Sequence, residues 1–256
     1  MCASEVHPYD RHVGRYGAAL AAGLIDVAAV RSGDRVLDVG CGTGQLASAV
    51  AAIVGGENVA AIDPGEGVVE VCRQRVPKGD VRVGTAESLP FADGDFDAVL
   101  AQLVINLVDD PRAAVREMAR VARPGGVVAA CFWDDEEMPL LRSFWDAARE
   151  LAPAEHSRVS AQAQVGVPDV ELLRGWWQQA GLGDVALGRF EVAADYESFD
   201  DLWFAFDAGI GHSGTLYASL DAEPQAAVRA TVHRRLGSPD GAFRLTAKVR
   251  TVRGTS

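Results

Sequence analysis

Apolar residues occur along the chain in short runs that alternate with longer segments of helical periodicity. The runs are rich in valine, isoleucine, leucine and alanine, as buried strands are. They predict strands at residues 35–40, 58–63, 81–83, 96–102, 127–133 and 185–192. The segments between them predict helices at residues 16–29, 42–54, 66–75, 110–122 and 168–180. Short strands that alternate with helices indicate an α/β fold, in which a doubly wound sheet is covered on both faces.

The last third of the chain departs from this alternation. Between Phe243 and Arg250, apolar and polar residues alternate with a period of two, which is typical of an antiparallel strand exposed on one side. Residues 134–167, with one predicted helix at 140–151, and residues 198–236, with two, lie outside the pattern. We therefore expect a single domain over residues 1–256, in which these two segments are helical insertions that form a cap over the active site.

Composition and charge narrow the possible functions. The 256 residues are 48% hydrophobic and 23% charged, which is ordinary for a globular protein with a sizeable core. With 36 acidic against 24 basic residues, the formal net charge is −12, so the protein should repel nucleic acid and anionic lipid. We expect a small-molecule ligand, neither nucleic acid nor membrane as a partner, and a monomer or a homodimer.

The N-terminal residues and the cysteines predict a cytoplasmic protein. Residues 1–15 contain several charged residues and histidines, and they lack the apolar core of a secretory signal. No uninterrupted apolar stretch approaches the roughly 20 residues that span a bilayer. The four cysteines are widely spaced without a C-x-x-C pair, so we expect reduced thiols and no metal site.

Three glycines, Gly40, Gly42 and Gly44, lie at the predicted turn between the first strand and the next helix. Glycines at such a turn allow a ligand to approach the backbone closely, although many turns use glycine only for its positive φ. Gln45 stands where the dinucleotide fingerprint G-x-G-x-x-G has its last glycine. A nicotinamide or flavin dinucleotide is therefore disfavoured.

Two aspartates beside this turn indicate the charge of the ligand. Asp38 directly precedes the glycines, where a carboxylate would repel phosphate but suits an amino group or a sulfonium cation. Asp63 ends the second predicted strand, where a carboxylate can accept two hydrogen bonds from a ribose diol. Together they predict a nucleoside that carries positive charge, and S-adenosylmethionine is the obvious candidate.

Four segments resemble the class I S-adenosylmethionine-dependent methyltransferases, in particular the small-molecule group that includes the ubiquinone and menaquinone biosynthesis type (methyltransferase type 11). They are VLDVGCGTG at 36–44, AIDP at 61–64, GTAESLPF at 84–91 followed by Asp95-Phe96-Asp97, and RVARPGGV at 120–127. Their order and spacing are typical of the family, and the resemblance covers about residues 11–133. It implies a Rossmann-like seven-stranded sheet of order 3-2-1-4-5-7-6 with strand 7 antiparallel.

The resemblance also implies roles for individual residues. The residues expected to bind S-adenosylmethionine are Gly40, Gly42 and Gly44 along the methionine and ribose, Asp63 with Pro64 at the ribose, Ala86 and Glu87 beside the adenine, Gln102 near the methionine, and Tyr16, which resembles an N-terminal aromatic residue that some relatives fold over the cofactor. Two positions depart from the family pattern. Thr85 replaces a frequent aspartate at the adenine, and Asn106 replaces a frequent histidine after the fourth strand.

The implied activity is methyl transfer by in-line displacement to an oxygen, nitrogen or carbon nucleophile of a small molecule. Positioning can supply much of the acceleration, so a general base is optional, and His156 and His212 in the predicted cap segments are the candidates for one. The alternative is a protein that binds S-adenosylmethionine or S-adenosylhomocysteine without methyl transfer, because a fold does not fix a function.

The aromatic residues of the two cap segments have two interpretations. Trp203, Phe204 and Phe206 either pack onto the sheet or line an apolar substrate pocket. In the second case, Phe144, Trp145, Trp203 and Phe206 would form an apolar wall, and the acceptor would be at least partly apolar.

Overall fold

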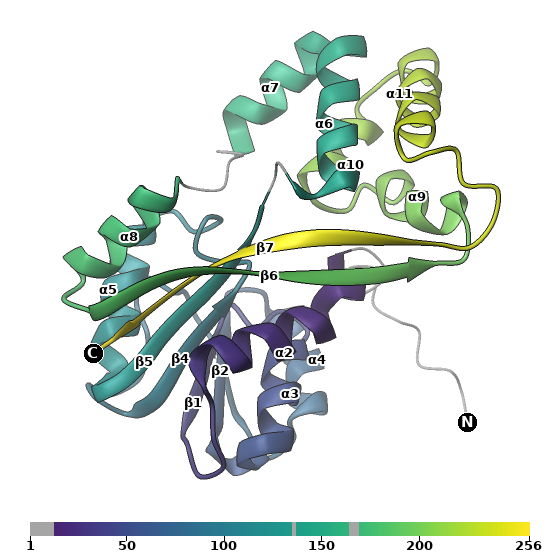
Figure 1. Ribbon diagram of the computed structural model, residues 1–256. Helices are drawn as coiled ribbons and strands as arrows, with labels where there is room; N and C mark the ends of the chain where they lie inside the picture. Colours follow the sequence, from purple (N-terminus) through teal and green to yellow (C-terminus); the bar gives the residue numbers. More distant parts are fainter. Residues whose placement is uncertain (1–12, 135–136, 164–168) are drawn as a thin grey trace, which may run out of the picture. The chain divides into compact units, whose positions relative to one another are not determined.

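The computed structural model describes residues 13–134, 137–163 and 169–256 (Figure 1). Its seven strands form one sheet in the order β3-β2-β1-β4-β5-β7-β6. Their bounds are β1 Val36–Val39, β2 Val59–Asp63, β3 Asp80–Val83, β4 Phe96–Gln102, β5 Ala122–Trp133, β6 Gly183–Tyr196 and β7 Phe243–Thr255. The strands β1 to β5 pair in parallel, and β7 pairs with β5 antiparallel. The predicted α/β fold, its strand order and its antiparallel strand are confirmed.

The chain divides into two compact units. The larger unit comprises Gly17–Trp133, Val167–Phe190 and Val249–Ser256, and it contains most of the sheet. The smaller unit comprises Met1–Tyr16, Asp134–Gly166 and Glu191–Lys248. The described residues of both expected cap segments fall in the smaller unit. Their role as a cap of a single domain stays a prediction.

The larger unit contains helices on both faces of the sheet (Figure 1). They are α2 Gly17–Ala28, α3 Gln45–Val54, the short η2 Gly56–Asn58, α4 Glu66–Arg75, α5 Pro111–Val121 and α8 Val170–Gln179. Helix α2 packs on α3, and α5 packs on α8. Asp110 caps the start of α5, because its carboxylate accepts hydrogen bonds from the amides of Arg112 and Ala113, and Pro111 is the first helical residue.

The strand β1 shows how alternate side chains reach opposite faces of the sheet. Leu37 and Val39 are buried in the core cluster that includes residues of α5 and α8. Asp38, between them, accepts a hydrogen bond from the backbone amide of Ala47 in α3, on the other face. The side chains on one face of β1 therefore belong to the hydrophobic core, whereas the other face places the Asp38 carboxylate at the start of α3.

The strand β5 begins earlier than the sequence predicts, at Ala122 instead of residue 127. Ala122 pairs with Phe96, and the next pair joins Val127 to Ala98, so the register shifts within the proline-glycine segment. Gly125 in this segment has a φ of 80°. The proline-glycine segment, which lies between the predicted helix and the predicted strand, is thus an irregular start of β5.

The smaller unit contains more helices than the sequence predicts. They are η1 Val13–Tyr16, α6 Pro139–Leu151, α7 Pro153–Ala163, α9 Phe199–Asp207, α10 Gly211–Ala218 and α11 Ala222–Arg235. The break between α9 and α10 lies at Gly209 and Gly211, whose φ values of 68° and 67° turn the chain. Among the residues described, no helix combines the length and apolar character needed to cross a membrane.

Candidate functional site

The loop between β1 and α3 is held against the end of β2. The backbone amides of Gly40 and Cys41 both donate to the carbonyl of Ile62, at 2.8 and 3.0 Å. Gly40, Gly42 and Gly44 have φ values of 72°, 51° and 85°, in the region that favours glycine. The sequence of this loop therefore permits a backbone path that other residues would strain.

The three glycines differ in what lies beside them. A Cβ atom added to Gly40 would lie 2.4 Å from a methyl group of Val104, and one added to Gly44 would lie 2.6 Å from the Cys72 sulfur. A Cβ atom added to Gly42 would meet nothing within 4 Å. Gly40 and Gly44 are thus required by packing, whereas Gly42 has open space where a ligand could contact the backbone.

The carboxylate of Asp63 links this loop to the segment after β2. Its Oδ2 accepts a hydrogen bond from the Gly42 amide, and its Oδ1 accepts one from the Gly65 amide, both at 2.9 Å. Each carboxylate oxygen has a further lone pair, so two more donors could still bind. Pro64, the next residue, is exposed.

Asp38 is buried below the same loop, with an exposed fraction of 1%. Its Oδ2 accepts the Ala47 amide hydrogen bond at 2.9 Å, but its Oδ1 has no hydrogen-bond partner within the described part of the chain. Burial raises the pKa of this carboxyl to about 7, and the hydrogen bond from Ala47 opposes the rise while the charge of Asp63 adds to it. An unpartnered buried carboxylate oxygen favours a cationic ligand nearby.

The carboxyl end of β4 carries a second unpartnered oxygen. Gln102 is the last residue of this strand, and its buried Oε1 has no hydrogen-bond partner among the described residues. Leu103 follows with a φ of 61°, an uncommon value for a side chain of this size. This turn leads to Val104, whose side chain packs against Gly40. No sequence signal marks the left-handed conformation of a leucine, so this contact could not be predicted from the sequence.

The two residues expected beside an adenine have different surroundings. Ala86 belongs to the hydrophobic core and is 7% exposed. The Oε1 of Glu87 accepts hydrogen bonds from the amides of Asp109 and Asp110, at 3.1 and 3.4 Å. Glu87 therefore connects its turn to the start of α5, and adenine binding by either residue stays a prediction.

The cysteine of the glycine loop is a packing group. A hydrogen bond with Cys72, together with burial, raises the pKa of the Cys41 thiol well above its usual range. Burial likewise raises the pKa of Cys131 to about 12. All three cysteines are buried and free, in line with the reduced thiols expected, and Cys2 lies outside the described residues.

Three further predicted residues belong to the smaller unit. Tyr16 is 1% exposed, and burial beside Tyr196 raises the pKa of its phenol far above the usual value. The ring of His156 in α7 lies 5.8 Å from that of Trp145, edge to face. His212 is exposed in the first turn of α10. No described contact assigns a proton-transfer role to either histidine.

The aromatic residues of the cap segments form the core of the smaller unit. Phe144, Trp203 and Phe206 have an exposed fraction of 0%. The rings of Trp203 and Phe206 stack at 4.4 Å, and those of Phe144 and Phe206 stack at 4.7 Å. Of the two interpretations of this cluster, packing is favoured over the wall of a substrate pocket.

Comparison with known proteins identifies the chemistry of the larger unit. The family described as "Methyltransferase domain" matches residues 37–130. The demethylmenaquinone methyltransferase of Clavibacter sepedonicus is 36% identical over 168 residues, which cover 60% of this chain and 67% of that protein. The enzyme of the same name from Renibacterium salmoninarum is 34% identical over 160 residues, covering 62% of this chain and 67% of that protein.

Solved structures share the fold at low identity. The YcgJ protein of Bacillus subtilis has a TM-score of 0.59 at 21% identity, covering 93% of this chain and 98% of that one. A geranyl diphosphate methyltransferase in complex with S-adenosylmethionine has a TM-score of 0.55 at 17% identity, covering 93% of this chain and 84% of that one. These likenesses extend the shared architecture over most of the chain.

Proposed function

This chain belongs to the class I S-adenosylmethionine-dependent methyltransferases of small molecules, and we propose that its glycine loop, Asp38 and Asp63 together bind the cofactor. The observation that carries the proposal is the buried Oδ1 of Asp38, which lacks a hydrogen-bond partner among the described residues. It lies below a loop that has open space at Gly42. A cationic nucleoside would offer a cation to the carboxylate and a sugar to the open backbone.

The chain's own residues divide the work of binding. Asp63, held by the amides of Gly42 and Gly65, would accept the ribose hydroxyl groups with its remaining lone pairs. Asp38 would balance the positive charge of the methionine part, and the Oε1 of Gln102 would accept a hydrogen bond from its ammonium group. Because backbone amides hold the carboxylates of Asp63 and Asp38 before the ligand arrives, little ordering of these two groups is needed on binding.

S-Adenosylmethionine, when bound, supplies a methyl group that the acceptor's lone pair takes, while the S–CH3 bonding pair stays on sulfur and any acceptor proton leaves to solvent. The chain must therefore hold the acceptor in line with the transferred group and exclude competing water. We propose that the residues of the smaller unit act as a cap that holds the acceptor and excludes water. With the assignment as a small-molecule methyltransferase, we also propose a cytoplasmic location.

The acceptor of the relatives is not carried over to this chain. Their name states demethylmenaquinone as the substrate, but the matched family segment, 37–130, includes none of the smaller unit. The segment contains the glycine loop and both aspartates, so the match supports the cofactor. The acceptor must be inferred from the rest of the chain.

Replacing Asp63 by alanine should weaken binding of S-adenosylhomocysteine by about tenfold to 100-fold. A hydrogen bond to a charged group contributes about 1.5–3 kcal/mol, and the change also leaves the amides of Gly42 and Gly65 without this acceptor. Isothermal titration calorimetry measures the affinity. Asp80→Ala is the matched control, because Asp80 lies at the opposite end of the adjacent strand β3. An affinity within twofold of the wild type in a folded Asp63→Ala protein would contradict the assignment.

Thermal denaturation tests the function as a whole. S-Adenosylmethionine and S-adenosylhomocysteine should each raise the melting temperature of the wild type, whereas NAD should leave it unchanged. Stabilisation by NAD alone would overturn the proposed function.

A further inference from the structure

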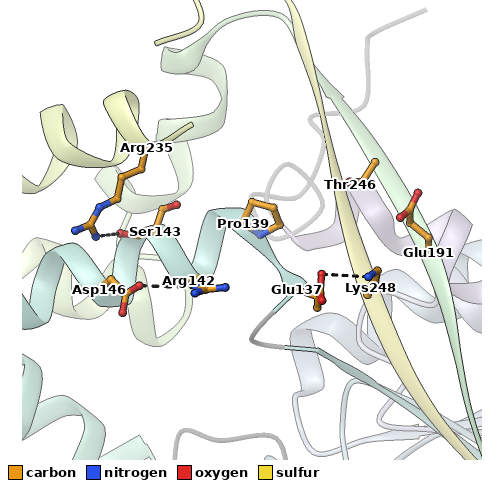
Figure 2. A pocket seen from close by; sticks show the side chains of 9 residues that line it. All are labelled: Glu137, Pro139, Arg142, Ser143, Asp146, Glu191, Arg235, Thr246 and Lys248. Atoms are coloured by element: carbon orange, nitrogen blue, oxygen red, sulfur yellow. Dashed lines mark hydrogen bonds and ion pairs between the residues drawn. The ribbon is translucent and has the colours of Figure 1, made fainter. Parts of the chain in front are cut away.

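A pocket of about 570 Å³ lies within the smaller unit (Figure 2). It is bordered by α6, the end of α11 and the strands β6 and β7. Six of its side chains are ionisable: the cations Arg142, Arg235 and Lys248, and the carboxylates Glu137, Asp146 and Glu191. The remaining lining residues include no large apolar side chain. This lining favours a small charged ligand over an apolar one.

The cations differ in how firmly their partners hold them. Both oxygens of the Glu150 carboxylate accept hydrogen bonds from Arg235 at 2.8 Å, and Glu150 is not part of the pocket wall. The charge of Arg235 is therefore balanced from outside the pocket. Lys248 pairs with Glu137 at 3.2 Å, and Arg142 lies 4.0 Å from Asp146.

The Lys248–Glu137 pair can be exchanged for a ligand at small cost. The two side chains are 43% and 49% exposed, and ion pairs at such exposure contribute little to stability. A ligand carboxylate could take the place of Glu137 beside Lys248. Arg142, with a side-chain exposure of 64%, is also accessible to it.

Glu191 provides a negative charge on another wall of the pocket. Figure 2 shows this side chain on the sheet side, apart from the residues of α6. It is exposed, and within the described part of the chain it forms no ion pair or hydrogen bond. Arg235 is balanced by Glu150 and Asp146 by Arg149, both from outside the pocket, so two cations and two carboxylates remain on its walls. An ion of either sign alone would therefore meet repulsion as well as attraction.

We propose that this pocket recognises the methyl acceptor, and that the acceptor is a small zwitterion with an ammonium group at Glu191 and a carboxylate at Lys248 and Arg142. The proposal rests on the proposed function. Its place in the chain supports it, because Glu137 follows the carboxyl end of β5 and Lys248 directly precedes Val249, the partner of Trp133. Open α/β sheets bind their ligands beyond the carboxyl ends of the strands.

The test is a titration of the full chain in the absence of cofactor. The ligands are glycine, β-alanine, γ-aminobutyrate and 6-aminohexanoate, and nuclear magnetic resonance detects their binding. Propionate and propylamine serve as analogues that carry one charge each. We expect at least one zwitterion to bind at least tenfold more tightly than either analogue. The inference is overturned if no zwitterion binds more tightly than they do.

Two variants connect this binding to the pocket. Lys248→Gln and Glu191→Gln should each weaken binding of the zwitterion at least fivefold, since each removes one of the three charged side chains proposed to hold it. Arg174→Gln is the control, because Arg174 is a half-buried cation of α8 that lies outside the pocket. It pairs with Glu171 of its own helix at 3.5 Å and donates to the carbonyl of Val185 at 3.5 Å. Equal affinity of the wild type and both pocket variants would show that the zwitterion binds elsewhere.

Two further measurements keep this inference separate from the proposed function. We expect S-adenosylhomocysteine to bind the Lys248→Gln protein with the same affinity as the wild type. If the wild type itself does not bind S-adenosylhomocysteine, the proposed function is refuted. The zwitterion that binds most tightly should also raise formation of S-adenosylhomocysteine from S-adenosylmethionine. Binding without such formation would overturn the assignment of this pocket to the acceptor.

Discussion

Replacing Gly42 by valine should weaken binding of S-adenosylhomocysteine by at least about 100-fold while the protein stays folded. The added side chain would fill the space beside Gly42, where a Cβ atom now meets nothing within 4 Å. If the cofactor occupies that space, the methyl groups of valine exclude it. Calorimetric titration measures the loss, and circular dichroism establishes that the variant is folded.

Backbone strain alone must be separated from this steric effect. A residue with a Cβ at the Gly42 φ of 51° costs roughly 1–2 kcal/mol, and a β-branched residue is less tolerated still. Gly33→Val is the matched control, because Gly33 has a φ of 93° and equally open surroundings but precedes β1 instead of following it. Both variants should lose similar stability, and only Gly42→Val should lose affinity. Equal affinities in the two variants would make Gly42 a turn residue only.

The residues near the glycine loop could be predicted because their signals are local. Gly42 lies in a short turn after an apolar run, and Asp63 ends the next run, so their positions follow from chain order and from parallel pairing. The period of two between Phe243 and Arg250 likewise reveals an antiparallel strand without knowledge of its neighbours.

Other features depend on contacts that no local pattern specifies. The aromatic character of Trp203 suits both a core and a pocket wall, and only its stacking on Phe206 distinguishes them. The charged pocket joins Glu137, Glu191 and Lys248, which are far apart in the sequence. The second helix of the first cap segment begins at Pro153, directly after α6, so its boundary is a single residue that periodicity does not resolve.

The stability of the wild type relative to Asp38→Asn should fall as the pH rises from about 4 to about 7. The folded protein holds the Asp38 proton up to a pKa of about 7, whereas the ordinary value is 3.8. The folded state therefore binds more protons than the unfolded state across this window, and stability decreases with pH. The gap between the two pKa values corresponds to about 4 kcal/mol, and it is absent in the variant.

Urea unfolding at a series of pH values measures this difference. Asparagine resembles the protonated carboxyl in shape and can still accept the Ala47 amide hydrogen bond. Other titrating groups are common to both proteins, so they cancel in the comparison. A difference in unfolding free energy that stays constant between pH 4 and pH 7 would show that Asp38 is ionised throughout.

The same carboxyl should couple binding of the cofactor to release of a proton. At pH 6, Asp38 of the free protein is mostly protonated, and the ammonium group of S-adenosylhomocysteine would favour its ionised form. Calorimetry in buffers of different ionisation enthalpy should therefore detect nearly one proton released by the wild type and none by Asp38→Asn. Between pH 5.5 and pH 7, the wild-type affinity should rise by up to about tenfold per pH unit, while that of the variant stays flat. If the Asp38→Asn protein still releases a proton on binding, another group is the source of that proton. The proposal that the Oδ1 of Asp38 binds the cationic group of the cofactor would then be contradicted.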